Sequence, residues 1–462
     1  MKTYALLLAA GKGTRMRTDM PKCAYPILKK PMIEYSIERL ENSLVDEICV
    51  VVGHKREVLM DLLGDRVQYV VQEEQLGTGH AVLCAEDLLK NKPGKTIILP
   101  GDMPLIETKL INKILNAHDD MGNDLTLVST LYDNPKGYGR ISRDKYGNVC
   151  SIVEDADLTD TQKQIKEVNT GVYVINNDIL FDCLKEIKIN EKKGEYYLTD
   201  IVSVMKRRFK IGLFLVRNSI LMMGINDLYQ ISIAEKHLRV EINKWHMLNG
   251  VSIINPETVT IGHDVEIHPG AVINPNTTIT GNSVIEADTI IGPNTEIHES
   301  TIKKNAQVKH SLVYDSEVGE FSTVGPFAHL RNHAVIGDHN RIGNFVEVKN
   351  SKIGSKTKAS HLSYIGDAEV GDRVNFGCGS VTVNYDGVNK HKTIIGSDVF
   401  IGCNVNMVAP INISDNVFIA AGSTVTEDIP AGALTIARSR QINKDDYAKN
   451  LVKPQIDEKK AL

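Results

Sequence analysis

Short runs of aliphatic and β-branched residues alternate with amphipathic stretches in the first half of the chain. The runs that we expect to form strands are Tyr4–Ala9, Glu47–Val52, Val67–Val71, Thr96–Leu99 and Leu125–Thr130. Amphipathic stretches between them, such as Met32–Asn42 and Gly79–Leu89, are expected to form helices. This alternation predicts a mostly parallel sheet with helices on both faces, and such sheets bind ligands at the carboxyl ends of their strands.

A period of six residues replaces this pattern after Val251. Before it, Asp227–Asn249 is predicted to form one amphipathic helix, because its apolar residues recur at helical spacing. The aliphatic residues that follow form three blocks with a fixed step of six: Ile261, Ile267, Ile273, Ile279, Ile285, Ile291 and Ile297; Val318, Val324, Leu330, Ile336, Ile342 and Val348; Ile395, Ile401, Met407, Ile413, Ile419 and Val425.

The six-residue period predicts a parallel β-helix. Each step would form one short strand and one tight turn, and the aliphatic side chain would stack inside the coil. Glycine often follows the aliphatic residue, and we expect it to permit turn conformations that are closed to other residues. These glycines are Gly262, Gly292, Gly319, Gly325, Gly337, Gly343, Gly396 and Gly402. A β-sandwich, the alternative, would show a period of two and irregular turns.

Length and composition agree with two domains rather than one. The chain has 462 residues, of which 42% are apolar and 24% charged, as in soluble globular proteins. We expect domains at residues 1–226 and 251–440, joined by a helix at 227–250 and followed by a tail at 441–462. No apolar run is long enough to span a bilayer, and the first one ends in a Gly-rich turn, which favours a buried strand over a signal peptide.

Cysteine usage and charge limit the location and the partners of the protein. The seven cysteines are scattered and lack CxxC spacing, which indicates reduced thiols in the cytoplasm. The formal charge of −5 gives no global attraction to nucleic acid or to a membrane. Anionic small-molecule substrates would therefore have to be bound by local clusters of Lys and Arg.

The first predicted strand opens into a loop that suits phosphate binding. Small residues at Ala9–Gly13 let backbone N–H groups approach phosphate oxygens, and Arg15 and Lys22 add positive charge. Neither a Walker A loop nor a dinucleotide fingerprint is present. The alternative is a strand-to-helix turn with a solvated basic edge. Asp102 follows another apolar strand, where it is either a metal ligand or a turn former.

These segments together resemble the sugar-nucleotide pyrophosphorylases. The loop has the signature L-A-A-G-K-G-T-R-M…P-K, with Lys22 as its final lysine, and the other matching segments follow in the expected order. They are Gln72–Gly79, Pro100–Leu105, Tyr138–Ile141, Glu154, Asn169–Gly171 and Gly224–Asn226. With the six-residue repeats included, residues 3 to 440 resemble the family of bifunctional N-acetylglucosamine-1-phosphate uridylyltransferases and glucosamine-1-phosphate N-acetyltransferases.

This resemblance implies a fold and a first active site. The fold is an α/β nucleotidyltransferase domain with a Rossmann-like mixed sheet, followed by a left-handed parallel β-helix of hexapeptide repeats. Arg15 and Lys22 would be catalytic, and Asp102 and Asn226 would hold Mg²⁺ while a sugar-1-phosphate attacks the α-phosphorus of UTP. The residues implied to bind UTP or the UDP-sugar are Leu8, Ala9, Ala10, Gly11, Lys22, Gln72, Gly77, Thr78, Gly101, Asp102, Gly139, Glu154, Asn169 and Asn226.

In the second half, polar residues gather where the six-residue period falters. The segments Phe327–Arg331, Gly343–Lys349 and Ser360–Asp367 lie about one coil of 18 residues apart. We therefore expect Arg331, Lys349 and His361–Tyr364 to converge on one face. Two cations beside a neutral imidazole suit an anionic sugar phosphate whose amine must lose a proton to His361. The alternative for His361 is an imidazole with a structural role only.

The segment Asn384–Lys392 interrupts the repeats, as expected either of a loop over a phosphate-bearing ligand or of a tolerated surface insertion. The resemblance favours the former. It implies that glucosamine-1-phosphate is bound by Arg331, Lys349, Tyr364 and Asn375. It also implies that acetyl-CoA is bound by Cys378, Asn384, Tyr385, Cys403, Ala421 and Arg438. The family tends to have small residues where this chain has Cys378 and Cys403, so we predict sensitivity to thiol reagents there.

Analogy with related acyltransferases, which place active sites between neighbouring coils, predicts a homotrimer. Two rival hypotheses remain. One is a pyrophosphorylase for another sugar phosphate that carries a related β-helix, and the other is a scaffolding protein that has lost its activity. The set Arg331, Lys349 and His361–Tyr364 is not expected in the first rival, and the presence of Arg15 and Asp102 argues against the second.

Overall fold

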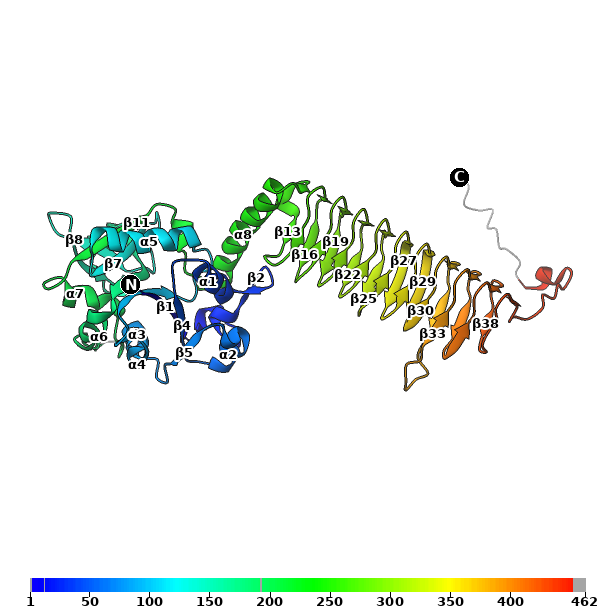
Figure 1. Cartoon of the computed structure of the whole chain (residues 1–462), viewed down its shortest axis with the longest axis horizontal. Coiled ribbons are helices and arrows are strands. Elements are labelled where there is room, and N and C mark those ends of the chain that lie inside the picture. The colour runs from blue at the N-terminus through cyan, green and yellow to red at the C-terminus, as the bar shows by residue number, and fades with distance from the viewer. Residues whose placement is uncertain (1, 12, 192, 452–462) are drawn as a thin grey trace, which may run out of the picture. The chain divides into compact units, whose positions relative to one another are not determined.

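The computed structural model describes residues 2–11, 13–191 and 193–451, shown in Figure 1. The chain divides into two compact units, Met1–Ile242 and Asn243–Leu462, and the boundary lies within helix α8 (Leu228–Leu248). In the described part of the chain, no helix is both long and apolar enough to cross a membrane. Each unit has its own core and its own candidate site.

The first unit is built on a mixed sheet. Its strands follow the order β11-β7-β10-β6-β1-β4-β5, and β8 and β9 are attached beside β10. β1 runs parallel to β4 and β6, whereas β10 is antiparallel to β6 and β7. The bounds are β1 Lys2–Leu8, β4 Glu47–Val52, β5 Gln68–Val71, β6 Gly94–Pro100, β7 Leu125–Leu131, β8 Arg140–Arg143, β9 Val149–Val153, β10 Glu167–Asn176 and β11 Ile211–Val216.

The strands predicted from the sequence are present within one or two residues at their ends, but one predicted helix is wrong. Gly79–Leu89 forms two helices, because the amide of Ala85 bonds back to Val82 in a turn between them. The helices and minor strands of this unit are α1 Met32–Glu41, α2 Arg56–Leu63, α3 Thr78–Leu83, α4 Glu86–Leu89, α5 Thr108–Met121, α6 Asn177–Lys185, α7 Ile201–Met205, β2 Pro26–Ile27 and β3 Lys30–Pro31.

Apolar residues pack against both faces of the sheet. One cluster includes Leu7, Val50 and Leu99, and the other includes Leu6, Val51 and Ile98. Neighbouring residues of one strand therefore enter opposite clusters, as the period of two in a strand requires. This double burial explains why the central strands are continuous apolar runs in the sequence.

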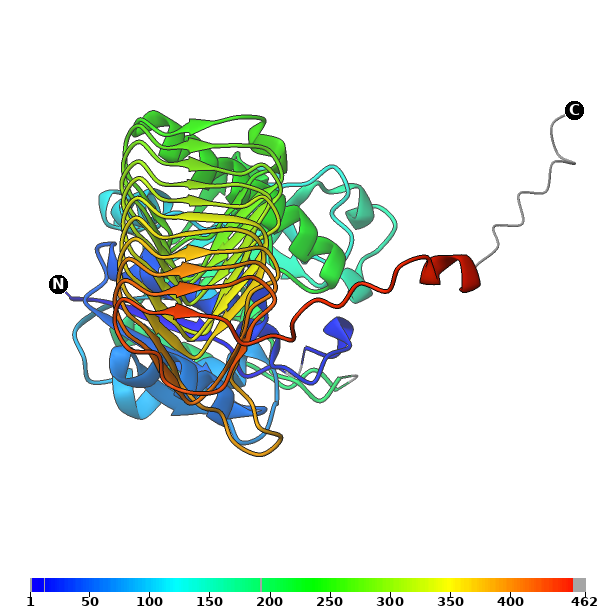
Figure 2. The ribbon, with the colours of Figure 1, turned by 90° about the vertical axis from the view of Figure 1, so that its right-hand side faces the viewer.

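The second unit is a parallel β-helix whose coils are stacked one on another (Figure 2). Its strands form three faces, numbered in the order in which the chain passes through them. The first face contains β12 Ser252–Ile253, β15 Val272–Ile273, β18 Ile290–Ile291, β21 Gln307–Val308, β24 Thr323–Val324, β31 Asn375–Phe376, β34 Phe400–Ile401, β37 Phe418–Ile419 and β39 Leu434–Thr435.

The second face contains β13 Thr260–Ile261, β16 Thr277–Thr280, β19 Thr295–His298, β22 Leu312–Tyr314, β25 His329–Arg331, β32 Val381–Val383, β35 Asn406–Val408 and β38 Thr424–Val425. The third contains β14 Glu266–Ile267, β17 Val284–Ile285, β20 Thr301–Ile302, β23 Glu317–Val318, β26 Val335–Ile336, β28 Lys352–Ile353, β30 Ala368–Val370, β33 Thr393–Ile395 and β36 Ile411–Ile413. β27 Arg341–Lys349 and β29 Lys358–Gly366 continue from the first face into the second.

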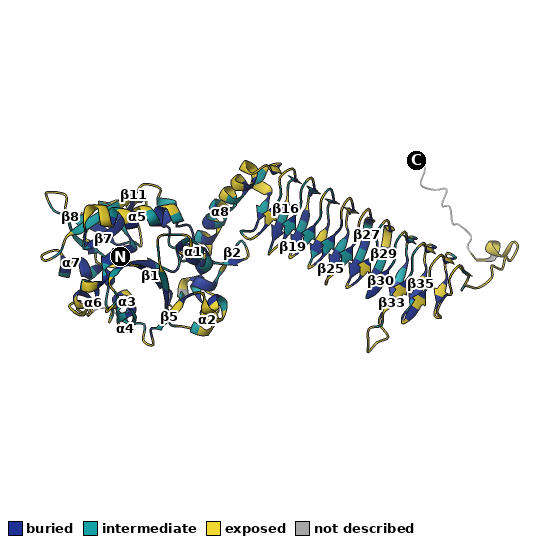
Figure 3. Ribbon diagram, viewed as in Figure 1, coloured by how far each residue is buried: buried dark blue, intermediate teal, exposed yellow. Residues whose placement is uncertain are grey.

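Aliphatic side chains fill the inside of the coils, and Figure 3 shows the buried residues along the strands. The slip in the six-residue period after Ile297 has a simple cause. The chain takes five-residue steps from Ile297 to Ile302 and from Val308 through Val313 to Val318, and all five side chains are fully buried. The turn is shorter at these points, but the interior column continues without a break.

Most of the glycines that follow the aliphatic residues are needed because a side chain would not fit there. The expectation that they serve unusual turn conformations is therefore wrong for most of them. Of the eight, only Gly292 and Gly325 have a left-handed φ, of +85° and +102°. At Gly343 a Cβ atom would lie 1.9 Å from the carbonyl oxygen of Ser360, on the next coil. These glycines therefore allow successive turns to approach each other closely.

The effect of this close approach can be measured with a matched pair of variants. Gly343→Ala should lower the free energy of unfolding of the β-helix unit by about 1–3 kcal/mol, because the added methyl group overlaps the next coil. Gly262→Ala is the control, since its Cβ atom would meet Thr280 at 3.4 Å, an ordinary contact. Thermal unfolding followed by circular dichroism tests the pair, and equal stability of the two variants would contradict this explanation.

Candidate active sites

The loop after β1 holds the first group of predicted residues around a cavity of about 260 Å³. The shape of the loop depends on Gly13. This residue has a φ of +62°, and a Cβ atom added to it would lie 2.6 Å from Cβ of Lys22. The loop therefore packs directly against this lysine. The cavity is lined by Leu8, Ala9, Gly11, Gly13, Arg15, Lys22, Cys23, Asp102 and Asn226, whereas Lys12 lies outside the described residues.

Lys22 joins segments that are far apart in the sequence. Its ammonium group forms an ion pair with the carboxylate of Asp102, and it donates a hydrogen bond of 2.8 Å to Oδ1 of Asn226. Arg15 donates to the same oxygen at 2.7 Å. The Lys22 and Asp102 side chains are only 14% and 19% exposed, so both charges lie in a sheltered place. The structure thus brings all four predicted residues together.

The oxygen atoms of this cluster fit a small divalent cation. Asp102 and Asn226 present a carboxylate and an amide oxygen to one and the same ammonium group. Hard cations such as Mg²⁺ prefer such oxygen ligands and use one or two of them together with substrate phosphates. The backbone keeps the two residues together, because the amide of Ile225 donates to the carbonyl of Asp102 at 2.9 Å.

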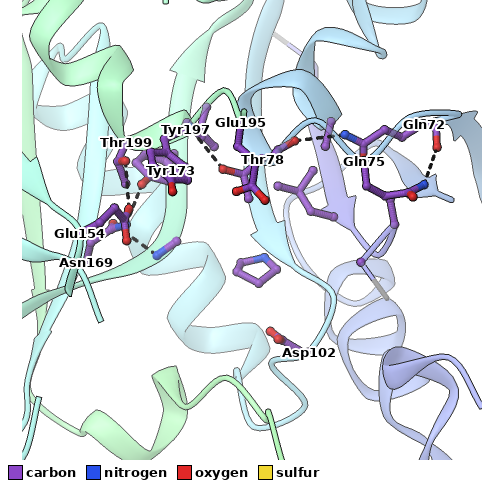
Figure 4. Close-up of a pocket in the computed structure, with 18 residues that line it drawn as sticks. Gln72, Gln75, Thr78, Asp102, Glu154, Asn169, Tyr173, Glu195, Tyr197 and Thr199 are labelled. Carbon is purple, nitrogen blue, oxygen red and sulfur yellow. Dashed lines mark hydrogen bonds between the residues drawn. The ribbon is translucent and has the colours of Figure 1, made fainter. Parts of the chain in front are cut away.

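A second cavity of about 700 Å³ opens beside the first, and Asp102 lines both. Figure 4 shows Gln72 and Gln75 on one side of it and Glu154 and Asn169 on the other, with Asp102 between them. The predicted residues that line it are Leu8, Ala10, Gly11, Gln72, Gly77, Thr78, Asp102, Glu154 and Asn169.

Two predicted glycines, Gly101 and Gly139, support this cavity without lining it. The amide of Gly101 donates to the carbonyl of Leu8 at 2.9 Å, which ties the end of β6 to the end of β1. A Cβ atom on Gly139 would lie 3.6 Å from the carboxylate of Glu154. The carbonyl of Gly139 also accepts a bond of 2.8 Å from the amide of Asn169.

One wall of the large cavity comes from a segment that the sequence interpretation missed. Glu195, Tyr197 and Thr199 line the cavity together with Leu198. A sequence signal existed at Gly77, where a Cβ atom would lie 2.7 Å from the carbonyl of Tyr196. A glycine at such a position indicates that another piece of backbone comes close, but it does not say which one.

Glu154 is a partly buried carboxylate at the wall of this cavity. It accepts a hydrogen bond of 3.0 Å from the hydroxyl of Thr199. Burial raises the pKa of Glu154, and the nearby carboxylates of Asp200 and Asp157 raise it further, while the bond from Thr199 acts in the opposite direction. The charged form of Glu154 is therefore disfavoured in the folded protein, as is typical of carboxylates in functional sites.

In the β-helix unit, Arg331 and Lys349 stand in register on neighbouring coils, and each forms an ion pair. Arg331 pairs with Glu347 at 2.7 Å, and Lys349 pairs with Asp367 at 2.9 Å. The Lys349 and Asp367 side chains are only 8% and 11% exposed. The site therefore carries its own counter-charges, which a bound anion would have to replace.

Asp367 is the centre of a polar cluster at the end of the second face. It accepts hydrogen bonds from Lys349, from Asn350 at 2.5 Å and from the amide of Asn384. Asn384 also reaches the hydroxyl of Tyr364 at 3.4 Å. The ring of Tyr364 lies over Gly366, where a Cβ atom would be 2.4 Å from that hydroxyl. Tyr364 and Asn384 thus belong to one network with Lys349.

The loop at residues 384–392 leaves the stack of coils and returns to it (Figure 1). It places Lys390, which the sequence interpretation had not singled out, against Lys349. The close approach and the positive charge of Lys349 lower the pKa of Lys390. Two cations this close disfavour each other's charged form, and they concentrate positive charge beside the Asp367 cluster.

His361 lies in the turn where β29 passes from the first face into the second. Its register partner is Asn344, whose Oδ1 is 2.9 Å from Nδ1 of the imidazole. With an amide oxygen as partner, Nδ1 carries the hydrogen atom and Nε2 is left as an acceptor. His361 is exposed and therefore open to a substrate. Tyr364, Arg331 and Lys349 lie beyond this turn on the second face, so His361 does not share their face or the column of Arg331 and Lys349.

The residues expected to bind acetyl-CoA fall into two groups. We call the turns between the first and second faces, at residues 343–345, 360–362, 377–379, 402–404 and 420–422, the first corner. Cys378, Cys403 and Ala421 lie there, and Cδ of Arg438 comes within 3.8 Å of a Cβ atom on Gly422. Asn384 and Tyr385 lie at the opposite end of the second face. Asn375, which was expected to bind glucosamine-1-phosphate, lies on the first face.

Comparisons with known proteins agree with both halves of this description. The family model for nucleotidyl transferases matches residues 4–218, and that for the GMPPB C-terminal domain matches residues 257–361. A protein of Acholeplasma laidlawii is 62% identical over 455 residues, which cover 98% of this chain and 99% of the relative.

Two further relatives come from other bacteria. The protein of Thermoanaerobacter pseudethanolicus is 48% identical and that of Streptococcus agalactiae serotype V is 43% identical. Both alignments cover 97% of this chain and 98% of the relative. All three relatives carry the name bifunctional protein GlmU. The chain therefore belongs to the GlmU family of bifunctional proteins.

Proposed function

We propose that this chain acetylates glucosamine-1-phosphate with acetyl-CoA and then couples the product to UTP, giving UDP-N-acetylglucosamine and pyrophosphate for cell-envelope precursors. The observation that carries the second step is the joining of Asp102 and Asn226 through Lys22 at the edge of a large cavity. We assign uridylyl transfer to residues 1–226 and acetyl transfer to residues 251–440. The helix at 227–250 connects them, and the tail at 441–462 takes part in neither.

In uridylyl transfer, an oxygen of the sugar phosphate attacks the α-phosphorus of UTP, and pyrophosphate leaves. The backbone of the loop at residues 8–11 and the cations of Arg15 and Lys22 bind the triphosphate and balance the charge that develops on it. Asp102 and Asn226 would hold Mg²⁺, and the bound ion would neutralise phosphate oxygens. Lys22 then exchanges its ion pair with Asp102 for an ion pair with a phosphate.

The opposite walls of the large cavity divide the recognition of the two substrates. Gln72, at the end of β5, donates to the carbonyl of Gly77 at 3.1 Å, and its rigid amide reads the uracil base together with Gly77 and Thr78. On the opposite wall, the carboxylate of Glu154 accepts hydrogen bonds from the sugar, and the amide of Asn169 can both donate and accept them. With the base on one wall and the sugar on the other, the phosphates between them lie beside Asp102.

In acetyl transfer, the amine of glucosamine-1-phosphate attacks the thioester carbon of acetyl-CoA, and the bond to sulfur breaks. Nε2 of His361 accepts the proton that the amine loses, and Asn344 keeps the imidazole in the required tautomer. The leaving sulfur is released as the thiol of CoA. Arg331, Lys349 and Lys390 bind the phosphate in place of Glu347 and Asp367, and Tyr364 and Asn375 complete the sugar site.

One assay tests both steps. The full chain is incubated with glucosamine-1-phosphate, acetyl-CoA, UTP and Mg²⁺, and free CoA and UDP-N-acetylglucosamine are measured separately. Both products are expected, and omission of acetyl-CoA should prevent both. Release of pyrophosphate with glucose-1-phosphate in place of the amino sugar, without any CoA release, would favour the rival pyrophosphorylase.

Replacing Glu154 by Gln tests the proposed sugar wall. Its partly buried carboxylate accepts a charged hydrogen bond from the sugar, so the variant should lose about tenfold or more in kcat/KM for N-acetylglucosamine-1-phosphate. Because the folded protein raises the pKa of Glu154, its charge costs stability once the pH exceeds the ordinary pKa of a glutamate. The variant should therefore unfold at a higher temperature than the parent at pH 7 and show no gain at pH 4.

The control for this prediction is Asp160→Asn, which removes a carboxylate whose side chain is 97% exposed. Neither kcat/KM nor the unfolding temperature should change in that variant. An unchanged kcat/KM for the Glu154 variant would remove this residue from the sugar site.

We also propose that the enzyme is a cytoplasmic homotrimer without nucleic-acid or membrane partners. A column of exposed apolar side chains supports self-association: Phe327, Phe345 and Leu362 are 57 to 58% exposed, and the two rings are stacked at 5.5 Å. A second copy that covers this column beside His361 would remove apolar surface from water. Light scattering should then give three times the chain mass of 51.1 kDa, and a monomer that still transfers acetyl groups would contradict a shared site.

A further inference from the structure

Cys378 and Cys403 occupy equivalent positions on two successive coils. On the first face, before them, Asn375 pairs with Phe400, and on the second face, after them, Val381 pairs with Asn406. Both pairs have the same sequence offset of 25, so the turn between them places Cys378 directly opposite Cys403. The loop at residues 384–392 causes the large offset, and it leaves the first corner undisturbed.

The two coils touch through their backbones at this point. A Cβ atom on Gly377 would lie 2.5 Å from the amide nitrogen of Cys403, and the amide of Asn404 donates to the carbonyl of Cys378 at 2.8 Å. Neighbouring strands lie about 4.8 Å apart. Disulfides form between Cα atoms roughly 4.4–6.8 Å apart. Gly377 and Gly379 flank Cys378, and without their side chains the two turns pack closely against each other.

These two thiols are also the accessible ones. All seven cysteines lie in the described part of the chain, and of these only Cys378 and Cys403 are exposed. Cys23, Cys49 and Cys183 are buried, and burial raises the pKa of Cys23 and Cys49 to about 12. Thiols with such a high pKa form little thiolate near neutral pH and react slowly. A small oxidant therefore reacts with Cys378 and Cys403 before it reacts with any other two cysteines.

We propose that Cys378 and Cys403 form a reversible disulfide across the two coils when a small disulfide such as oxidised glutathione is present. One thiolate attacks a sulfur of the small disulfide and releases one small thiol. The second thiolate then attacks the protein sulfur of the mixed disulfide and releases the other. The protein loses two protons and two electrons, and both are recovered in the two small thiols.

The position of this disulfide couples it to acetyl transfer. Lys358 pairs with Asn375 and Tyr364 with Val381, both with an offset of 17, so His361 stands directly opposite Cys378 on the preceding coil. His361, Cys378 and Cys403 thus follow one another in a single column. The disulfide would close the surface that we assign to acetyl-CoA, and this consequence rests on the proposed function. Oxidation would then switch off acetyl transfer alone.

The test uses the reduced full chain treated with oxidised glutathione, with intact mass, peptide mapping and both activities as readouts. We expect a mass about 2 Da lower, five free thiols instead of seven when they are counted after denaturation, and one linked pair of peptides that contains Cys378 and Cys403. Acetyl transfer should be lost and then restored by dithiothreitol, while uridylyl transfer continues. Saturating acetyl-CoA should slow the formation of the disulfide.

Three single variants sharpen the test. Cys378→Ser and Cys403→Ser should each stop the loss of 2 Da, whereas Cys150→Ser, which removes a half-buried thiol of the other unit, should leave the disulfide intact. A stable glutathione adduct without the link, a link between other cysteines, or a linked protein with full acetyl transfer would each overturn the proposal. If the reduced protein released no CoA at all, the proposed acetyl transfer would fail, but the mass would still report on the disulfide.

Discussion

Replacing His361 by Ala should lower acetyl transfer by about 10²–10⁴-fold and leave uridylyl transfer from supplied N-acetylglucosamine-1-phosphate unchanged. The amine of the substrate is protonated near neutral pH and cannot attack until a base removes its proton. Nε2 of His361 is the exposed acceptor at this place, because Asn344 occupies Nδ1. Release of free CoA in a single-turnover experiment measures the effect directly.

Two controls accompany this variant. His333→Ala removes another exposed imidazole of the β-helix unit and should leave acetyl transfer unchanged. Asn344→Ala should lower the rate less than the His361 variant does, because the base remains while its tautomer is no longer held. If the His361 variant lost both activities, or kept full acetyl transfer, the assignment of the base would be wrong.

Replacing Asp102 by Ala should have the converse effect, with uridylyl transfer lowered by about 10²–10³-fold or more and acetyl transfer unchanged. The carboxylate serves two functions: it is the charged oxygen ligand of the proposed Mg²⁺ site, and it holds Lys22 in place. Without it, the charge on the phosphates is less well balanced and the lysine loses its position. Pyrophosphate release measured over a range of Mg²⁺ concentrations should show a higher requirement for the metal in Asp102→Asn.

The matched control for Asp102 is Asp65→Ala, which removes an exposed carboxylate of the same unit. Its uridylyl transfer and its Mg²⁺ requirement should equal those of the parent. An Asp102 variant that failed in acetyl transfer as well would contradict two independent sites, and one with normal uridylyl transfer would remove Asp102 from the reaction.

The two halves of the fold differ in how far the sequence predicts them. In the β-helix, contacts between coils join residues only 16 to 25 positions apart, so the repeat itself predicts which strands pair. In the mixed sheet, β10 (Glu167–Asn176) inserts between β6 and β7 in antiparallel orientation. No local pattern indicates such a pairing, because it depends on packing across the whole domain.

The candidate residues show the same division. Arg15, Lys22, Asp102, Asn226 and His361 were named from sequence motifs. Each motif carries its chemistry within a few positions, so a single sequence reveals it. Lys390, Thr199 and Glu195 were not named, since their positions depend on a loop that folds back and on a segment that packs against Gly77. Residues of this kind have no periodicity of their own.

The sequence by itself thus determined the two-part architecture and the coil interior, and it named the main candidate site residues, because these follow from short-range periodicity and compact motifs. Only the tertiary structure decided which charges meet. It paired Lys22 with Asp102 and Lys349 with Asp367, and it placed Cys378 opposite Cys403. The physical reason is that hydrogen bonds, ion pairs and sulfur contacts act over a few ångströms, and the fold alone brings distant residues to that distance.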